Sequence, residues 1–162
     1  MSNDFRTFSE YMKKEDHSLT ASMEDYLEMI YRLSPTTGFV RIHELSDALS
    51  VSPPSVTKMV QKLHELGLIK YEKYGYIILE DKGKAIGEML LRRHNHIEAL
   101  LSILGISSPI IVSETEKIEH TICDETIACI EEFIGFMRCN PDVATRYYDY
   151  RESGHTTVPS GR

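Results

Sequence analysis

Residues 43–67 constrain the fold more than any other part of this chain. Two short helical patterns, at 43–50 and from Pro53 to about Leu66, are joined by a turn at 51–54. Ser52 is a favourable N-cap, Pro53 suits the first helical position, and Gly67 ends the second helix. This arrangement is typical of a helix-turn-helix. The second helix carries an apolar stripe at helical spacing, formed by Val56, Met59, Val60 and Leu63.

Shorter patterns predict the elements around this motif. A helix over 22–33 precedes it, with Ser22 as its N-cap, and an extended piece at 39–42 follows that helix. Two short strands at 68–73 and 76–80 are joined at Tyr74-Gly75. They predict a β-hairpin in the place where a winged helix has its wing.

The rest of the chain is expected to be helical. A long helix over 81–104 ends at Gly105, and an apolar loop over 106–112 follows it. Further helices are expected at 113–123 and 125–138 and from Pro141 onward.

These elements predict a mainly α protein. An N-terminal winged helix-turn-helix of three helices and a two-stranded wing is followed by an all-helical domain. The expected divisions are an N-terminal extension at 1–20, the winged helix-turn-helix at 21–84, the helical domain at 85–152, and a disordered tail at 153–162.

Composition narrows the class of protein. The chain has 162 residues and a net charge of −7, which argues against a protein that coats nucleic acid indiscriminately. No apolar run is long enough for a membrane span, and the N-terminus lacks a signal-peptide core, so a cytoplasmic protein is expected. The three cysteines form no Cys-x-x-Cys pair. Free, buried or half-buried thiols are therefore expected.

The second helix of the motif is the expected DNA reader. Such a helix lies in the major groove, and its N-terminal residues lie nearest the base edges. An ordinary solvated helix face is the alternative, because exposed lysines are common. The expected DNA contacts are Ser55, Thr57, Lys58, Gln61 and Lys62 on the helix, with Lys70, Lys73 and Tyr74 in the wing.

A second set of residues has the chemistry of a metal site. Asp25 and Glu28 are neighbours on one helix face, and His94 falls on the apolar stripe of the long helix. Glu116-x-x-Glu119-His120 adds three donors on one face of the following helix. Each residue also has a structural explanation. Asp25 suits a first turn, Ser113 and Glu116 have capping-box spacing, and His94 suits a hydrogen-bonded core.

The donor types of the full set favour particular cations. Four carboxylates and two imidazoles, without a thiolate or thioether, suit Mn²⁺ or Fe²⁺ better than Cu⁺ or a structural Zn²⁺. Six such ligands are enough for two ions. The residues alone do not show that the three helices converge.

Two other classes of protein share parts of this pattern. A winged-helix regulator that senses a small organic ligand would keep the DNA half and need none of the metal ligands. A dinuclear metal hydrolase would use a similar cluster to activate water. No nucleophile motif or Gly-rich phosphate loop supports an enzyme, so a non-enzymatic protein without an organic cofactor is expected.

The most specific stretches resemble a known family. From Ser22 to Asn140 the chain resembles the diphtheria toxin repressor superfamily, specifically its manganese transport regulator branch. The resemblance rests on SMEDYLEMIY at 22–31, SVTKMVQKL at 55–63, YEKYGYIIL at 71–79, DKGKAIG at 81–87, RRH at 92–94 and ETEKIEH at 114–120.

The resemblance implies a homodimer that binds palindromic double-stranded operator DNA and represses metal-uptake genes in response to Mn²⁺. It implies two Mn²⁺ per subunit, with Fe²⁺, Cd²⁺, Co²⁺ or Zn²⁺ as expected substitutes; an Fe²⁺ sensor is the alternative. The carboxylates at positions 25 and 116 favour manganese, because the iron-responsive branch has Met and Cys there. The implied ligands are Asp25, Glu28, His94, Glu116, Glu119 and His120.

Two features depart from the family pattern. The N-terminal extension is longer than expected for this branch. The wing tip, Tyr74-Gly75-Tyr76, lacks the basic residue expected there, so the resemblance does not carry over a phosphate contact at the tip.

Overall fold

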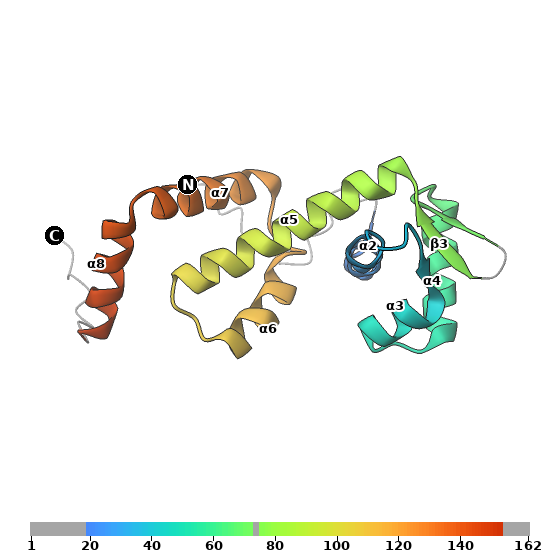
Figure 1. Ribbon diagram of the computed structural model, residues 1–162, viewed down its shortest axis with the longest axis horizontal. Helices are drawn as coiled ribbons and strands as arrows, with labels where there is room; N and C mark the ends of the chain where they lie inside the picture. The colour runs from blue at the N-terminus through green and yellow to red at the C-terminus, as the bar shows by residue number, and fades with distance from the viewer. Residues whose placement is uncertain (1–18, 73–74, 154–162) are drawn as a thin grey trace, which may run out of the picture. The chain divides into compact units, whose positions relative to one another are not determined.

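The computed structural model describes residues 19–72 and 75–153, which form two compact units. The division falls between Arg92 and Arg93, inside one continuous helix, α5 (Asp81–Ile103). Most of the predicted N-terminal extension and the tail beyond Ser153 lie outside the described residues, as do Lys73 and Tyr74. The expected mainly α fold is confirmed (Figure 1).

The first unit contains the predicted helix-turn-helix. Helix α2 (Ala21–Leu33) precedes α3 (Ile42–Leu49), and a tight turn leads into α4 (Pro53–Glu65). Ser52 and Pro53 occupy the predicted cap and first helical positions. Gly67 has φ +68° and ends α4 as expected, with the Leu68 amide donating to the Leu63 carbonyl at 3.1 Å.

The N-cap of α2 is Thr20, two residues earlier than the predicted Ser22. The Thr20 side-chain oxygen accepts a hydrogen bond from the Met23 amide at 3.3 Å. Since Thr20 already caps the first turn, Ser22 lies inside the helix, where its side chain is exposed. The predicted cap was therefore wrong, although the end of the helix at Leu33 was right.

The wing has one strand more than expected. The hairpin of β2 (Ile69–Tyr71) and β3 (Tyr76–Leu79) is present as predicted. The short extended piece becomes β1 (Val40–Arg41), which pairs antiparallel with β3 and gives the sheet order β1-β3-β2. Sequence patterns had located this piece but could not show its long-range pairing.

A continuous apolar core joins α2, α3, α4 and the sheet. Leu27, Ile30 and Leu63 are fully buried in it, and Ile77 contributes from β3. The N-terminal part of α5 closes the core with Leu90. This packing fixes α4 with Val56, Val60 and Leu63 inward and its polar side chains outward.

The second unit consists of helices around the C-terminal part of α5. They are α6 (Ser108–Ile118), α7 (Asp124–Cys139) and α8 (Pro141–Glu152). Gly105, with φ +74°, ends α5 as predicted. Ile97, Ile134 and Met137 are buried in this unit.

Helix α6 differs most from expectation. It begins at Ser108 rather than Ser113, with Ser107 as N-cap, and it ends at Ile118 rather than residue 123. The predicted capping box of Ser113 and Glu116 is therefore wrong. Ser113 lies inside the helix and its hydroxyl donates to the Ile110 carbonyl at 3.1 Å.

The three cysteines are free, as predicted, but exposed rather than buried. Ile134 and Met137 define the inward side of α7. At 100° per residue, Cys129 and Cys139 fall on other sides of that helix, and Cys123 lies just before its first turn.

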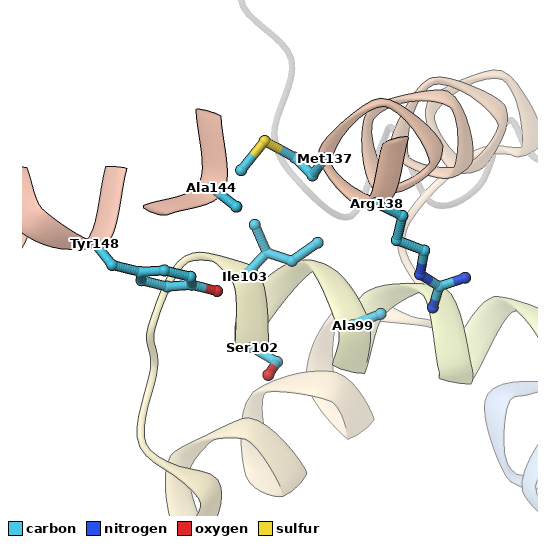
Figure 2. Close-up of a pocket in the computed structure, with 7 residues that line it drawn as sticks. All are labelled: Ala99, Ser102, Ile103, Met137, Arg138, Ala144 and Tyr148. Carbon is cyan, nitrogen blue, oxygen red and sulfur yellow. The ribbon is translucent and has the colours of Figure 1, made fainter. Parts of the chain in front are cut away.

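An open cavity of about 250 Å³ lies where α5, α7 and α8 meet. Figure 2 shows Ile103 of α5 in its middle, with Tyr148 of α8 at one end and Arg138 of α7 at the other. The three helices therefore leave incompletely filled space within this single chain. No helix of the described ranges is both long enough and apolar enough to cross a membrane.

Candidate metal centre and nucleic-acid interface

Helix α2 presents two carboxylates one turn apart, Asp25 and Glu28, here called the α2 carboxylate pair. Thr20 fixes the start of this helix, and Leu27 and Ile30 anchor it in the core. Glu28 is only 8% exposed, and its Oε1 accepts a hydrogen bond from Arg32 Nε at 2.8 Å. Asp25 is half-buried. Two carboxylates so close together favour a nearby cation.

The pKa of Tyr26 is affected by burial and by the negative charge of the neighbouring Asp25. Burial raises the pKa of its phenol above the ordinary value, and the negative charge of Asp25 raises the pKa further. Both causes favour the neutral phenol, so Tyr26 is a protonated neighbour of Asp25 at neutral pH.

A second donor group, here called the His94 cluster, lies in the C-terminal unit and consists of His94, Glu119 and His120. His94 Nδ1 lies 2.8 Å from Glu119 Oε2, and His120 Nε2 lies 3.6 Å from Glu119 Oε1. His94 is 7% exposed and Glu119 is 4% exposed. The inward orientation predicted for His94 is confirmed.

Glu119 and His120 are held by a turn rather than by a helix. Glu119 caps the end of α6, and its amide donates to the Thr115 carbonyl at 3.0 Å. His120 lies in the turn that follows. The expectation of three donors on one helix face was therefore wrong for these two residues. Glu116 lies inside α6 and is exposed.

Arg93 is a contributor that sequence reasoning missed. Its Nη1 donates to the Glu119 carbonyl oxygen at 3.3 Å, and its Nη2 donates to Asp124 Oδ1 at 2.9 Å. The residue is only 7% exposed. Arg93 thus ties the turn that carries Glu119 to α5, directly beside His94. An Arg in an ordinary charged helix pattern gives no sign of this burial.

Glu98 also approaches His94, with its Oε1 3.5 Å from His94 Nε2. It lies one turn further along α5, at the i, i+4 spacing that makes helical residues neighbours. Its side chain is 40% exposed. That spacing is the signal by which the sequence could have located it.

The donor chemistry fits a hard divalent cation. Buried carboxylates are costly unless a positive charge or hydrogen bonds compensate them. Glu28 and Glu119 are both buried, with Arg32 and His94 within hydrogen-bond distance of them. The two groups together offer carboxylate oxygens and imidazole nitrogens without a thiol. Such donors suit Mn²⁺ or Fe²⁺.

The other candidate surface is the outward side of α4. Ser55, Lys58, Gln61 and Lys62 are exposed there, opposite the buried stripe. Thr57 is half-buried, and its hydroxyl donates to the Pro53 carbonyl at 3.0 Å. Its methyl group is therefore the part suited to an apolar contact with a base.

In the wing, the structure describes only one of the three predicted DNA contacts. Lys70 on β2 is exposed, and its Nζ lies 3.5 Å from Glu80 Oε1. Lys73 and Tyr74 fall outside the described residues. A carboxylate beside Lys70 weakens its attraction to a phosphate, so this lysine is a less favourable contact than its sequence position indicates.

Two family models match the chain. The N-terminal DNA binding domain of the iron dependent repressor matches residues 18–77, and the metal binding and dimerisation domain of the iron dependent repressor matches residues 80–147.

Curated relatives agree with these matches. The HTH-type transcriptional regulator MntR of Lysinibacillus sphaericus is 40% identical over 127 residues, covering 78% of this chain and 91% of the relative. The protein of the same description from Listeria welshimeri is 45% identical over 123 residues, covering 76% of this chain and 87% of the relative.

Solved structures share the fold. The structure of the manganese regulator SloR matches 73% of this chain with a TM-score of 0.63 and 32% identity. The match covers 55% of that protein, so this chain spans about half of its length. The resemblance expected from the sequence is confirmed. With a DNA-binding domain followed by a metal-binding and dimerisation domain, the chain belongs to the iron dependent repressor family.

Proposed function

We propose that this protein is a manganese-responsive transcriptional repressor that binds operator DNA as a homodimer and represses metal-uptake genes. The observation that carries the proposal is the buried pairing of His94 with Glu119, beside His120, in a chain whose first unit is a winged helix. Two similarities support it: one to a relative described as an HTH-type transcriptional regulator, and one to a solved structure described as a manganese regulator.

The proposed site holds two Mn²⁺ per subunit and takes its ligands from the α2 carboxylate pair, the His94 cluster and Glu116. Glu116 completes the ligand set, although it is exposed in the single chain. Fe²⁺, Cd²⁺, Co²⁺ and Zn²⁺ offer compatible coordination and are proposed as substitutes. The proposed ligands are Asp25, Glu28, His94, Glu116, Glu119 and His120.

The residues explain how such a site can regulate. Four carboxylates repel one another when they are brought together, so the ligand set by itself opposes the close approach of its members. A bound divalent cation would supply positive charge, which would offset this repulsion. Arg93 fixes the Glu119 backbone to α5, and the core anchors α2 to α4. Because the core joins α2 to α4, a contact that restrains α2 also restrains α4, the helix proposed to read DNA.

Dimerisation determines the form of the operator. The C-terminal unit exposes large apolar side chains on α6 and α7, and such exposure marks an interaction surface. Two copies related by a two-fold axis present two α4 helices, so the proposed operator is a palindrome with half-sites about one helical turn apart. The exposed side chains include Ile110, Val112, Phe133 and Phe136.

The decisive test is operator binding under metal control. Fluorescence anisotropy with the promoter of a manganese-uptake gene from the source genome compares Mn²⁺, Fe²⁺, Zn²⁺ and chelator. We expect Mn²⁺ to tighten binding about tenfold or more, and DNA to tighten Mn²⁺ binding by the same factor, because such coupling is reciprocal.

Matched variants separate metal binding from structure. Glu119→Gln keeps the shape of the buried side chain and removes its charge, and it should abolish the Mn²⁺ effect. Glu114→Gln makes the same change inside α6, at a half-buried residue whose carboxylate pairs with Lys117 at 2.8 Å, and it should leave the effect intact. Equal binding in chelator would overturn the manganese proposal and favour a sensor of an organic ligand. A response to Fe²⁺ alone would make the protein an iron sensor.

A further inference from the structure

The outer face of the wing sheet carries a cation beside the wing tip. Arg41 on β1 pairs with Tyr76, the first residue of β3 after the hairpin turn. A Cβ placed on Gly75 would lie 3.9 Å from Ile42 Cγ1, so the chain at 41–42 borders the hairpin turn. Arg41 is exposed. A strand distant in sequence thus brings an arginine to the region where the wing tip itself has no basic residue.

Two aromatic rings hold this arginine in place. The rings of Phe39 and Tyr76 pack edge to face, with centroids 4.6 Å apart. The Arg41 guanidinium carbon lies 5.3 Å from the Tyr76 centroid and 5.9 Å from the Phe39 centroid, and Nη2 donates to the Tyr76 hydroxyl at 3.3 Å. These contacts limit the side chain's freedom and lower the entropic cost of binding a partner.

The charge of Arg41 is also available to a partner. Within residues 19–72 and 75–153, no carboxylate forms a salt bridge with its guanidinium. The nearby Glu44 carboxylate accepts instead from the Arg41 backbone amide at 2.7 Å. Lys70 lies on the same face of the sheet, since it pairs with Ile78, but it has Glu80 beside it. Arg41 is therefore the stronger candidate for an external anion.

We propose that Arg41 binds a phosphate of the DNA backbone beside the wing and so supplies the contact that the wing tip lacks. The proposal rests on the proposed function as a DNA-binding repressor. A guanidinium presents paired donors that match a phosphate, and contacts of this kind position a protein on the duplex without reading its sequence. Phe39 and Tyr76 act as positioning residues.

The test is the salt dependence of DNA binding by the full-length, Mn²⁺-loaded protein. Anisotropy is measured between about 50 and 200 mM salt, on the operator duplex and on a scrambled duplex of equal length. Arg41→Gln should weaken binding to both duplexes by the same factor. The slope of log affinity against log salt should fall by about 0.9 for each lost contact. Arg41→Lys should restore the slope.

Arg146→Gln is the matched control, because it removes one exposed positive charge from α8 in the other unit. It should leave the slope unchanged. For the positioning role, Tyr76→Phe keeps the ring and should bind nearly as well as the wild type, whereas Tyr76→Leu should weaken binding to both duplexes. Wild-type binding by Tyr76→Leu would overturn that role.

Two results would overturn the Arg41 contact while leaving the proposed function intact. One is an unchanged salt slope in Arg41→Gln. The other is a loss confined to duplexes with A·T-rich flanks, which would indicate minor-groove reading rather than a phosphate contact. A wild-type protein that shows no Mn²⁺-dependent operator binding would overturn both proposals together.

Discussion

His94 Nδ1 lies 2.8 Å from Glu119 Oε2, although 25 positions separate the two residues in the sequence. Both side chains are almost entirely removed from solvent. A buried imidazole–carboxylate pair is either a structural hydrogen bond or part of a ligand set, and geometry alone allows both. The two roles differ in how the protein responds to a divalent cation.

Substitution of His94 distinguishes these roles. A ligand that binds only the folded protein stabilises it by about 2.7 kcal/mol at a hundredfold excess over its Kd, which raises Tm by roughly 5–10 °C for a chain of this size. We expect Mn²⁺ to raise the Tm of the wild type by this amount and to have little effect on His94→Asn. Differential scanning fluorimetry with and without Mn²⁺ measures both.

The control for this experiment is His96→Gln, two residues further along α5. His96 is half-buried and does not belong to the proposed ligand set. Its substitution can lower the starting Tm but should preserve the increase caused by Mn²⁺. A full Mn²⁺ response in His94→Asn would show that the pairing with Glu119 is structural only.

Arg93 should contribute strongly to stability through its buried hydrogen bonds. Its side chain is 9% exposed, whereas its partner Asp124 is 83% exposed. Arg93→Met removes the donor to the Glu119 carbonyl and should cost about 2 kcal/mol in urea denaturation. Asp124→Asn affects only the exposed end of the interaction and should cost less than about 1 kcal/mol. Equal costs for the two variants would contradict this assignment.

Local signals were sufficient to predict the helix-turn-helix and the wing hairpin. Ser52-Pro53 and Gly67 mark the ends of α4, and a helix boundary of this kind depends on only a few neighbouring residues. The pairing of β1 with β3 was not predictable in this way. It joins Arg41 to Tyr76 across 35 positions, and a two-residue strand has too little pattern to specify a partner.

The error in α6 has a different cause. The sequence predicts an apolar loop over 106–112, whereas α6 already begins at Ser108. Ile110 and Val112 are exposed in the structure, so the apolar residues of this segment do not form one buried face. Ser107 and Pro109 carried the true start signal, as N-cap and second helical residue. Hydrophobic periodicity predicts a helix only where one face is buried, so it does not detect a surface helix whose apolar residues face outward.

In the candidate site, too, features with a local sequence signal were predictable and features that depend on distant residues were not. The inward position of His94 followed from its spacing with Leu90 and Ile97, both of which are buried. The approach of Glu119 to His94 depends on a turn after α6, which no helical pattern describes. Burial of Arg93 was missed because arginines are seldom buried unless they are paired, and the partner carbonyl is distant in sequence.

Two helical glycines should respond in opposite ways to alanine. A Cβ at Gly83 of α5 would lie 1.9 Å from the Leu68 carbonyl oxygen, so the backbone must move to accept it. Gly83→Ala should therefore destabilise the protein by about 3 kcal/mol, despite its better helix propensity. At Gly135 of α7 a Cβ would meet no atom within 4 Å, and Gly135→Ala should stabilise by up to about 1 kcal/mol.

Urea denaturation of both glycine variants, with the wild type in parallel, measures these changes. The comparison also isolates the cause, since each variant adds one methyl group at a helical position. Stabilisation by Gly83→Ala would show that α5 can shift away from Leu68 at little cost. Destabilisation by Gly135→Ala would show that the exposed side of α7 is covered in the assembled protein.

Cys123 should be more reactive near neutral pH than an unassisted thiol. Its Sγ lies 3.2 Å from the Thr126 hydroxyl, and this hydrogen bond is the main cause that lowers the pKa of the thiol. A lowered pKa increases the thiolate fraction at a given pH, and the thiolate is the nucleophile. In a Cys129→Ser/Cys139→Ser background, Thr126→Val should shift the pH profile of iodoacetamide alkylation upward and slow the reaction at neutral pH. In concentrated urea the Val and Thr forms should react alike, because the hydrogen bond exists only in the folded chain. An alkylation profile that Thr126→Val leaves unchanged in the folded protein would rule out this hydrogen bond as the cause.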